Sequence, residues 1–128
     1  MRMVIVGIAL AFAAVASADE LNDAMSAAQK CSSEALMRYA VTSTDTADAV
    51  AIAAFDRCSM LWGAAAEIMA ARIEADPGTA EVRKNAVRYG LPVGSPLQTL
   101  KIASDTLKAD FLAHASTLVF ELRAQAAH

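Results

Sequence analysis

Two cysteines, Cys31 and Cys58, lie symmetrically about a polar turn sequence. Their midpoint falls between Thr44 and Asp45, inside the run Thr42-Ser43-Thr44-Asp45-Thr46, and helical patterns flank this run on both sides. Two antiparallel helices joined at such a turn place both cysteines at similar height on facing sides. The spacing therefore predicts a helical hairpin closed by a Cys31–Cys58 disulfide, with Cα atoms about 5–6 Å apart.

The first eighteen residues have the pattern of a secretory signal peptide. Met1-Arg2-Met3 supplies a positive start, residues 4–16 are apolar with one glycine, and Ala16-Ser17-Ala18 offers the small residues of a cleavage site. The apolar run is too short for a membrane-spanning helix, which needs ~20 residues. We therefore expect cleavage after Ala18 and no membrane span in the mature chain, residues 19–128.

The mature chain is short and mildly acidic. Its 110 residues are enough for a single domain with one core. Of the 11 basic and 14 acidic residues, only Arg2 lies in the signal segment, so the mature net charge is 10 minus 14, or −4. This charge disfavours nucleic acid and anionic membrane surfaces as partners. Export to the periplasm or outside the cell favours a bonded cysteine pair over free or metal-bound thiols.

The hydrophobic pattern after residue 18 is helical throughout. Apolar residues recur at three- and four-residue steps, and alanine is abundant. The pattern predicts an all-α fold, a small up-down bundle of three long helices and one short one, with the disulfide between the first two. The expected helices span residues 19–40, 45–75, 80–89 and 96–125. The second is expected to be continuous over about 45 Å.

Local signals mark the helix ends. Either Thr44 or Asp45 is expected to N-cap the second helix, and Thr79 the third. Asp76-Pro77-Gly78 should end the second helix, because proline disfavours helix in the preceding residue and glycine accepts the left-handed turn. Ser95-Pro96-Leu97-Gln98 predicts a capping box at the start of the last helix.

The predicted core is rich in alanine and poor in aromatic residues. Small side chains bury little apolar area each, so we expect the disulfide to supply a large share of the stability. Trp62, Phe111 and His114 stand out as the large side chains of a possible ligand site. The inner face of the last helix is expected to contain Leu100, Ala103, Leu107, Phe111, His114, Ala115, Leu118 and Leu122.

The sequence contains no motif for catalysis or metal binding. H-x-x-H, H-E-x-x-H and C-x-x-C-H are absent, and the two cysteines lack the C-x-x-C spacing of redox pairs. Glu67 and Glu74 lie two turns apart on one helix face, without a histidine or a glycine-rich loop to give them catalytic roles. We therefore predict no catalytic residues, no metal, no cofactor and no enzymatic activity.

One segment suggests haem as an alternative. Residues Asp19 to Met25 are similar to the start of soluble periplasmic b-type cytochromes, which are four-helix bundles. That resemblance implies haem held between Met25 and a histidine of the last helix, here His114. However, His114 precedes the expected helix end by about ten residues, too deep to meet Met25. A histidine in or at the edge of the core is the interpretation that we prefer.

Arg83, Lys84 and Arg88 form a basic cluster on the short third helix. Lys84 and Arg88 are four residues apart and Arg83 adjoins Lys84, so the three can share one surface. Two interpretations stay open: a solvated helix face, or a site for an anion or an acidic partner.

The last helix has a second apolar stripe, formed by Ile102, Ala109, Ala113 and Phe120. It lies away from the expected core face. Either the third helix covers this stripe, or it is exposed and marks a self-association surface.

The hairpin also resembles a group of known proteins. The pattern Cys31-x-x-x-Ala35-x-x-x-Tyr39, followed by Ala53-Ala54-Phe55-x-x-Cys58, resembles small exported all-helical proteins of Gram-negative bacteria with a single cysteine pair. The resemblance implies the fold and the export, and it assigns no functional residue.

Two functions are consistent with these features. The first is a non-enzymatic periplasmic or secreted module that acts through protein contacts. The second is a carrier for a small ligand or a haem-like cofactor in the bundle interior. A well-packed bundle favours the first, and an internal pocket of several hundred Å³ lined by Trp62, Phe111 and His114 favours the second.

Overall fold

The computed structural model describes the backbone of residues 2–127 and the side chains of residues 19–127. The elements are five helices: α1 (Arg2–Thr42), α2 (Ala47–Arg57), α3 (Ser59–Ala75), α4 (Pro77–Arg88) and α5 (Pro96–Ala126). The prediction of an all-α fold is confirmed. The signal peptide falls on residues 1–18, whose side chains lie outside the described residues, so it stays a prediction.

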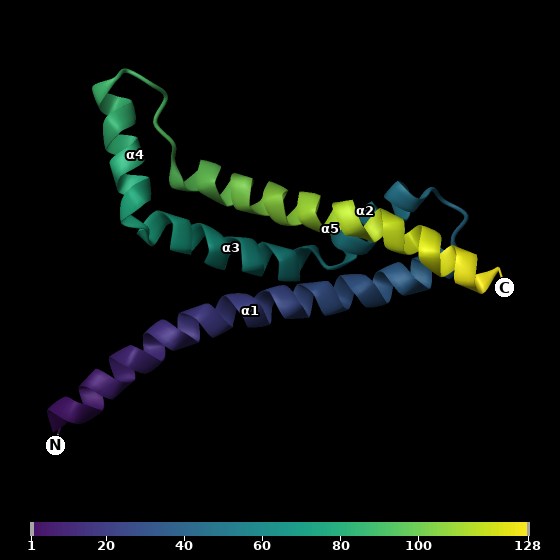
Figure 1. The fold of residues 1–128 in the computed structure, drawn as a ribbon, viewed down its shortest axis with the longest axis horizontal. Coiled ribbons are helices and arrows are strands. Elements are labelled where there is room, and N and C mark those ends of the chain that lie inside the picture. The colour runs from purple at the N-terminus through teal and green to yellow at the C-terminus, as the bar shows by residue number, and fades with distance from the viewer. Residues whose placement is uncertain (1, 128) are drawn as a thin grey trace.

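The long helices α1 and α5 run in the same direction, and α2 and α3 pack against both (Figure 1). Arg123 near the end of α5 fixes their register. Its guanidinium donates to the carbonyl oxygens of Ala40 and Ser43, each at 2.9 Å. These carbonyls lie at the C-terminus of α1, where backbone acceptors lack helical partners and a positive charge is favourable.

The predicted hairpin and disulfide are confirmed. Cys31 of α1 is bonded to Cys58, with 6.0 Å between their Cα atoms. The predicted N-caps of the second helix are wrong by one or two residues. Thr46 is the N-cap, and its hydroxyl accepts from the backbone N–H of Ala49 at 3.2 Å.

The prediction of one continuous second helix is wrong. The helix breaks at Cys58 into α2 and α3, which are bent by 73°. The N–H of Cys58 bonds to the carbonyl of Phe55, three residues back, instead of the α-helical carbonyl four residues back. No proline or glycine lies at this point, so local sequence gave no signal for the break.

Aromatic packing accounts for the bend. In a straight helix, Phe55 and Trp62 would be separated by about 10.5 Å along the axis. Across the bend their rings stack, with centroids 5.1 Å apart, and both rings contact Phe111 of α5. The bend thus gathers three aromatic rings in one cluster and brings Cys58 within bonding distance of Cys31.

The core is built mainly from alanine, as predicted. Eleven of the nineteen buried hydrophobic residues among residues 19–127 are alanines. Leu36, Val50 and Val119 are the largest apolar side chains that are almost fully buried. Leu61 and Ile73, two of the larger apolar residues of α3, are exposed. Small side chains let the helices approach closely, but each buries little apolar area.

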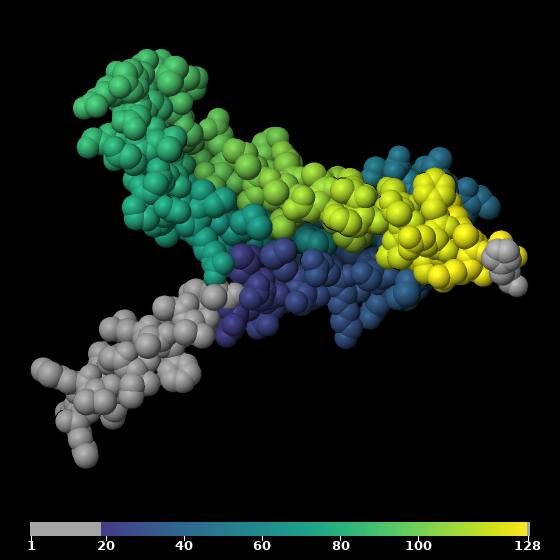
Figure 2. Space-filling view, viewed as in Figure 1, coloured from purple at the N-terminus to yellow at the C-terminus, as the bar shows by residue number. Residues whose placement is uncertain are grey.

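Helix α4 departs from the predicted bundle. It turns away from the other helices at Asp76 and contains no buried residue (Figures 1 and 2). Asp76 is its N-cap, accepting from the N–H of Gly78 at 2.8 Å, and Pro77 occupies the first helical position. The expected cap, Thr79, instead donates to the carbonyl of Ile73. Gly90, with φ of 66°, follows the helix end.

The start of α5 agrees with its sequence signal. The hydroxyl of Ser95 accepts from the N–H of Gln98, and the Gln98 side chain accepts from the N–H of Ser95. This reciprocal pair is the predicted capping box, with Pro96 at the first helical position.

Candidate functional site

A groove of about 640 Å³ lies between α1 and α5. Its lining residues are Met25, Gln29, Ser33 and Leu36 of α1, Trp62 of α3, and Leu107, Asp110, Phe111, His114, Ala115 and Leu118 of α5. The three residues singled out in the sequence, Trp62, Phe111 and His114, thus come together on one surface. The groove opens to solvent on one side, so it differs from the enclosed internal pocket expected of a carrier.

The floor of the groove is formed by a buried, hydrogen-bonded tryptophan. Trp62 is only 4% exposed, and its indole N–H donates to the hydroxyl of Ser32 at 2.7 Å. Ser32 is fully buried and was not predicted as a core residue. The signal was present, because Ser32 lies four residues after Ala28 and four before Leu36, both of which are buried. A serine within an apolar stripe indicates a buried hydroxyl that needs a partner.

His114 lies at the rim of the groove, so its prediction as an inner-face residue is wrong. The side chain is exposed, and its Nδ1 lies 3.0 Å from the carbonyl oxygen of Asp110. Leu118, also predicted to face inward, is 38% exposed. The buried residues of α5 are Thr99, Ala103, Leu107, Ala115 and Val119. These residues follow one another mostly at steps of four, and each such step turns the buried stripe by about 40° around the helix axis. By Ala115 and Val119, the stripe therefore no longer lies on the side of α5 that contains His114 and Leu118.

The register of α1 against α5 bears on the haem alternative. Arg123 of α5 is hydrogen-bonded to Ala40 of α1. A residue of α5 therefore lies at the same level along the helix axes as the α1 residue whose number is about 83 lower. Met25 is then level with Lys108 and lies about 9 Å along the helices from His114. Side chains on parallel helices lean the same way, so the offset persists. Met25 and His114 line one groove but do not fit as opposite ligands of one haem iron.

The basic cluster of α4 does not form one open surface. Arg83 is paired with Glu74 of α3, with 2.6 Å between its Nη2 and Oε1 of the carboxylate. Thr99 of α5 donates to the same carboxylate at 2.6 Å. Lys84 and Arg88 are exposed on another side of α4. Arg83 therefore joins α3, α4 and α5, and two cations are left for the proposed anion or partner site.

The Glu74 network predicts a dependence of stability on pH. Hydrogen bonds from Arg83 and Thr99 lower the pKa of Glu74 from 4.5 to about 2. Its stabilising contribution should be complete above pH 4.5 and should be lost as the pH falls from 4.5 towards 2. Thermal unfolding in this range should show a shallower pH slope for Glu74→Gln than for the wild type. Glu81→Gln on α4 is the control, and equal slopes for all three proteins would contradict the prediction.

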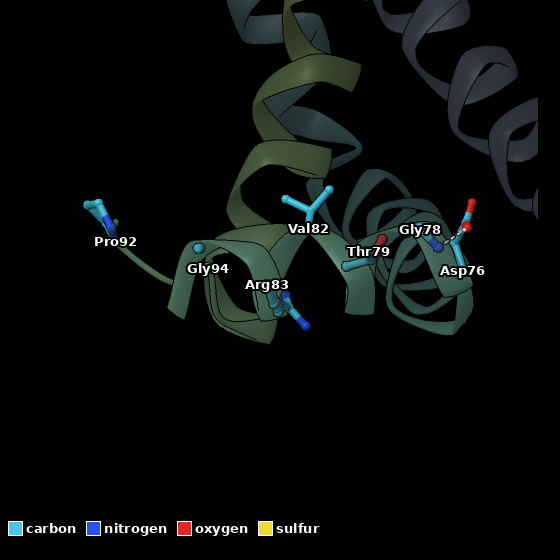
Figure 3. Close-up of a pocket in the computed structure, with 8 residues that line it drawn as sticks. Asp76, Gly78, Thr79, Val82, Arg83, Pro92 and Gly94 are labelled. Atoms are coloured by element: carbon cyan, nitrogen blue, oxygen red, sulfur yellow. Dashed lines mark hydrogen bonds between the residues drawn. The ribbon is translucent and has the colours of Figure 1, made fainter. Parts of the chain in front are cut away.

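A second hollow, of about 470 Å³, lies at the base of α4. It is lined by Asp76, Gly78, Thr79, Val82, Arg83, Ala86, Pro92 and Gly94 (Figure 3). Its polar side chains already have partners within the fold: Asp76 caps α4, Thr79 bonds to Ile73, and Arg83 bonds to Glu74. The hollow therefore presents few free polar groups to a ligand.

The second stripe of α5 is exposed. Ile102 is 62% and Phe120 69% accessible, and Ala109 and Ala113 are exposed between them. Helix α4 points away and does not cover them (Figure 1). Of the two arrangements considered for this stripe, the structure contains the uncovered one.

Within the described side chains, no group of three or more His, Cys, Asp or Glu is placed to hold a metal ion. No single described helix is long and apolar enough to span a membrane, and α2 and α3 meet that criterion only as a bent pair. Comparison with protein families, curated proteins and solved structures finds no match to this chain.

Proposed function

We propose that this chain is exported, is cleaved after Ala18, and works in the periplasm or outside the cell as a non-enzymatic helical module. It acts through contacts with another protein, and the groove between α1 and α5 is the contact surface. The observation that carries this proposal is the mainly apolar groove, in which Met25, Phe111 and Leu118 remain accessible over a floor formed by the buried Trp62.

The shape of the groove favours a helical segment as the occupant. Helices α1, α5 and the α2–α3 pair occupy three positions of a four-helix bundle, and α4 points away from the fourth (Figure 1). From Met25 to Leu36 the groove extends about 16 Å, or three turns of a docked helix. An amphipathic helix with apolar residues at three- and four-residue spacing would cover this lining.

A small amphipathic ligand is the second candidate occupant. The volume, about 640 Å³, lies in the range of ligand sites, and four polar side chains accompany the apolar lining. These are Gln29, Ser33, Asp110 and His114. Such a ligand would place its apolar part on Phe111 and Leu118 and its polar part near Asp110.

Site-specific photocrosslinking in the native cells tests the proposal. A photoreactive residue at Ser33 points into the groove, whereas one at exposed Glu34 serves as a matched control on the adjacent position. We expect Ser33 to crosslink to one defined protein, Glu34 not to do so, and Leu118→Asp to reduce the Ser33 product at least tenfold. Equal crosslinking at both positions, or none at Ser33, contradicts the proposal. Native mass spectrometry of the purified protein tests the alternative, which requires a bound small molecule.

A further inference from the structure

We infer that the second stripe of α5 pairs with the same stripe of a second copy, antiparallel, about a two-fold axis that passes midway between Ala109 and Ala113. Thr106 and Ser116 lie between the four apolar residues of the stripe, so residues 102, 106, 109, 113, 116 and 120 are spaced 4-3-4-3-4 along the helix. This is the heptad spacing of a helix–helix seam, and no member is charged. The inference is independent of the groove, which lies on another face of α5.

The order of residues along the stripe is what points to a second copy. Ile102 lies nine residues before Phe111 and Phe120 nine after it. Ala109 and Ala113 lie two before and two after, so antiparallel pairing sets each Ala109 against an Ala113. Ile102 then meets Phe120 at both ends. A two-fold interface requires this reciprocity, in which residue i contacts j and j contacts i.

Side-chain sizes along the stripe suit close pairing. The alanines at the centre allow the two helices to approach closely. At each end of the interface, Ile102 of one copy then packs against Phe120 of the other. Ser116 donates to Asp48 of α2 at 2.6 Å, which keeps α2 beside the stripe. Ile52, one turn further along α2 and 41% exposed, extends the apolar surface there.

The area indicates a weak pair. Ile52, Ile102 and Phe120 are 41%, 62% and 69% exposed, so each can bury only that fraction of its surface in the pair. Stable complexes bury about 1,200 Å² or more. The dimer should therefore be weak and populated only at high protein concentration.

Sedimentation equilibrium of the oxidised mature protein between 10 μM and 1 mM tests this inference. We expect a reversible monomer–dimer equilibrium that Ile102→Glu weakens at least tenfold. Leu97→Glu is the matched control, because Leu97 is 79% exposed on α5 but lies off the stripe. A monomer throughout the range, or equal effects of both substitutions, overturns the inference. Circular dichroism should be unchanged, since both residues are exposed.

A charge exchange tests the register. In the proposed pairing, Ile102→Glu of one copy faces Phe120→Lys of the other, so the double variant should dimerise at least twofold more tightly than the product of the two single-variant losses predicts. A parallel pairing would set glutamate against glutamate and lysine against lysine. Losses that simply multiply in the double variant, or exceed that product, would therefore overturn the antiparallel register.

Discussion

We expect the double substitution Cys31→Ala and Cys58→Ala to lower the free energy of unfolding by about 3–4 kcal/mol. The disulfide joins residues 27 positions apart. Closing a loop of that length lowers the conformational entropy of the unfolded chain, which raises its free energy by about 3–4 kcal/mol. The total free energy of unfolding of a protein domain is only ~5–15 kcal/mol, so this loss would be a large share of it. The melting temperature should fall by roughly 12–32 °C, because each kcal/mol shifts the melting temperature of a domain of this size by about 4–8 °C.

Urea unfolding of the wild type and of the double variant measures this effect, with and without dithiothreitol. The reductant should destabilise the wild type and leave the double variant unchanged. The oxidised wild type should titrate no free thiol, since Cys31 and Cys58 are bonded. A double variant with wild-type stability would show that the alanine-rich core needs no crosslink.

Local signals in the sequence predicted the hairpin well. The symmetric position of the cysteines about the turn gave the disulfide, and Ser95 with Gln98 gave the capping box. Each of these depends on a few neighbouring residues or on one simple spacing. Such features are readable without knowing how the helices pack.

The break at Cys58 was not predictable in this way. It depends on Phe55 and Trp62 stacking together and on Phe111, which lies 49 residues beyond Trp62 in sequence. The helical pattern continues through residues 56–60, because Arg57 and Met60 favour helix and the stretch contains no proline or glycine that would mark a bend. Tertiary contacts decided the geometry here.

The candidate groove was predicted only in part. Trp62 and Phe111 stood out as scarce aromatic residues, but the rim residues Gln29, Ser33 and Asp110 look like ordinary solvated positions in the sequence. Their role depends on α1 and α5 running in parallel and on α4 leaving the bundle (Figure 1). Neither arrangement is encoded in a local motif.

Trp62→Ala should cost about 3–5 kcal/mol, the range for truncating a buried aromatic side chain. Trp62 is 4% exposed and contacts both Phe55 and Phe111, so its removal leaves a cavity under the groove. Met60→Ala, two residues earlier and at an 89% exposed position, is the control and should change stability by less than about 0.5 kcal/mol. Comparable losses for the two variants would contradict the observed packing.

Substitutions at Ser32 and Trp62 can distinguish the contribution of their hydrogen bond from that of ring packing. Ser32→Ala leaves the buried N–H of Trp62 without its acceptor and should cost about 1–3 kcal/mol, more than its volume change alone. In Trp62→Phe the N–H is absent, so adding Ser32→Ala to that variant should cost at least 1 kcal/mol less. Urea unfolding of the four proteins gives this coupling directly. If Ser32→Ala costs the same in both backgrounds, the bond at 2.7 Å contributes nothing to stability, and the floor of the groove is held by ring packing alone.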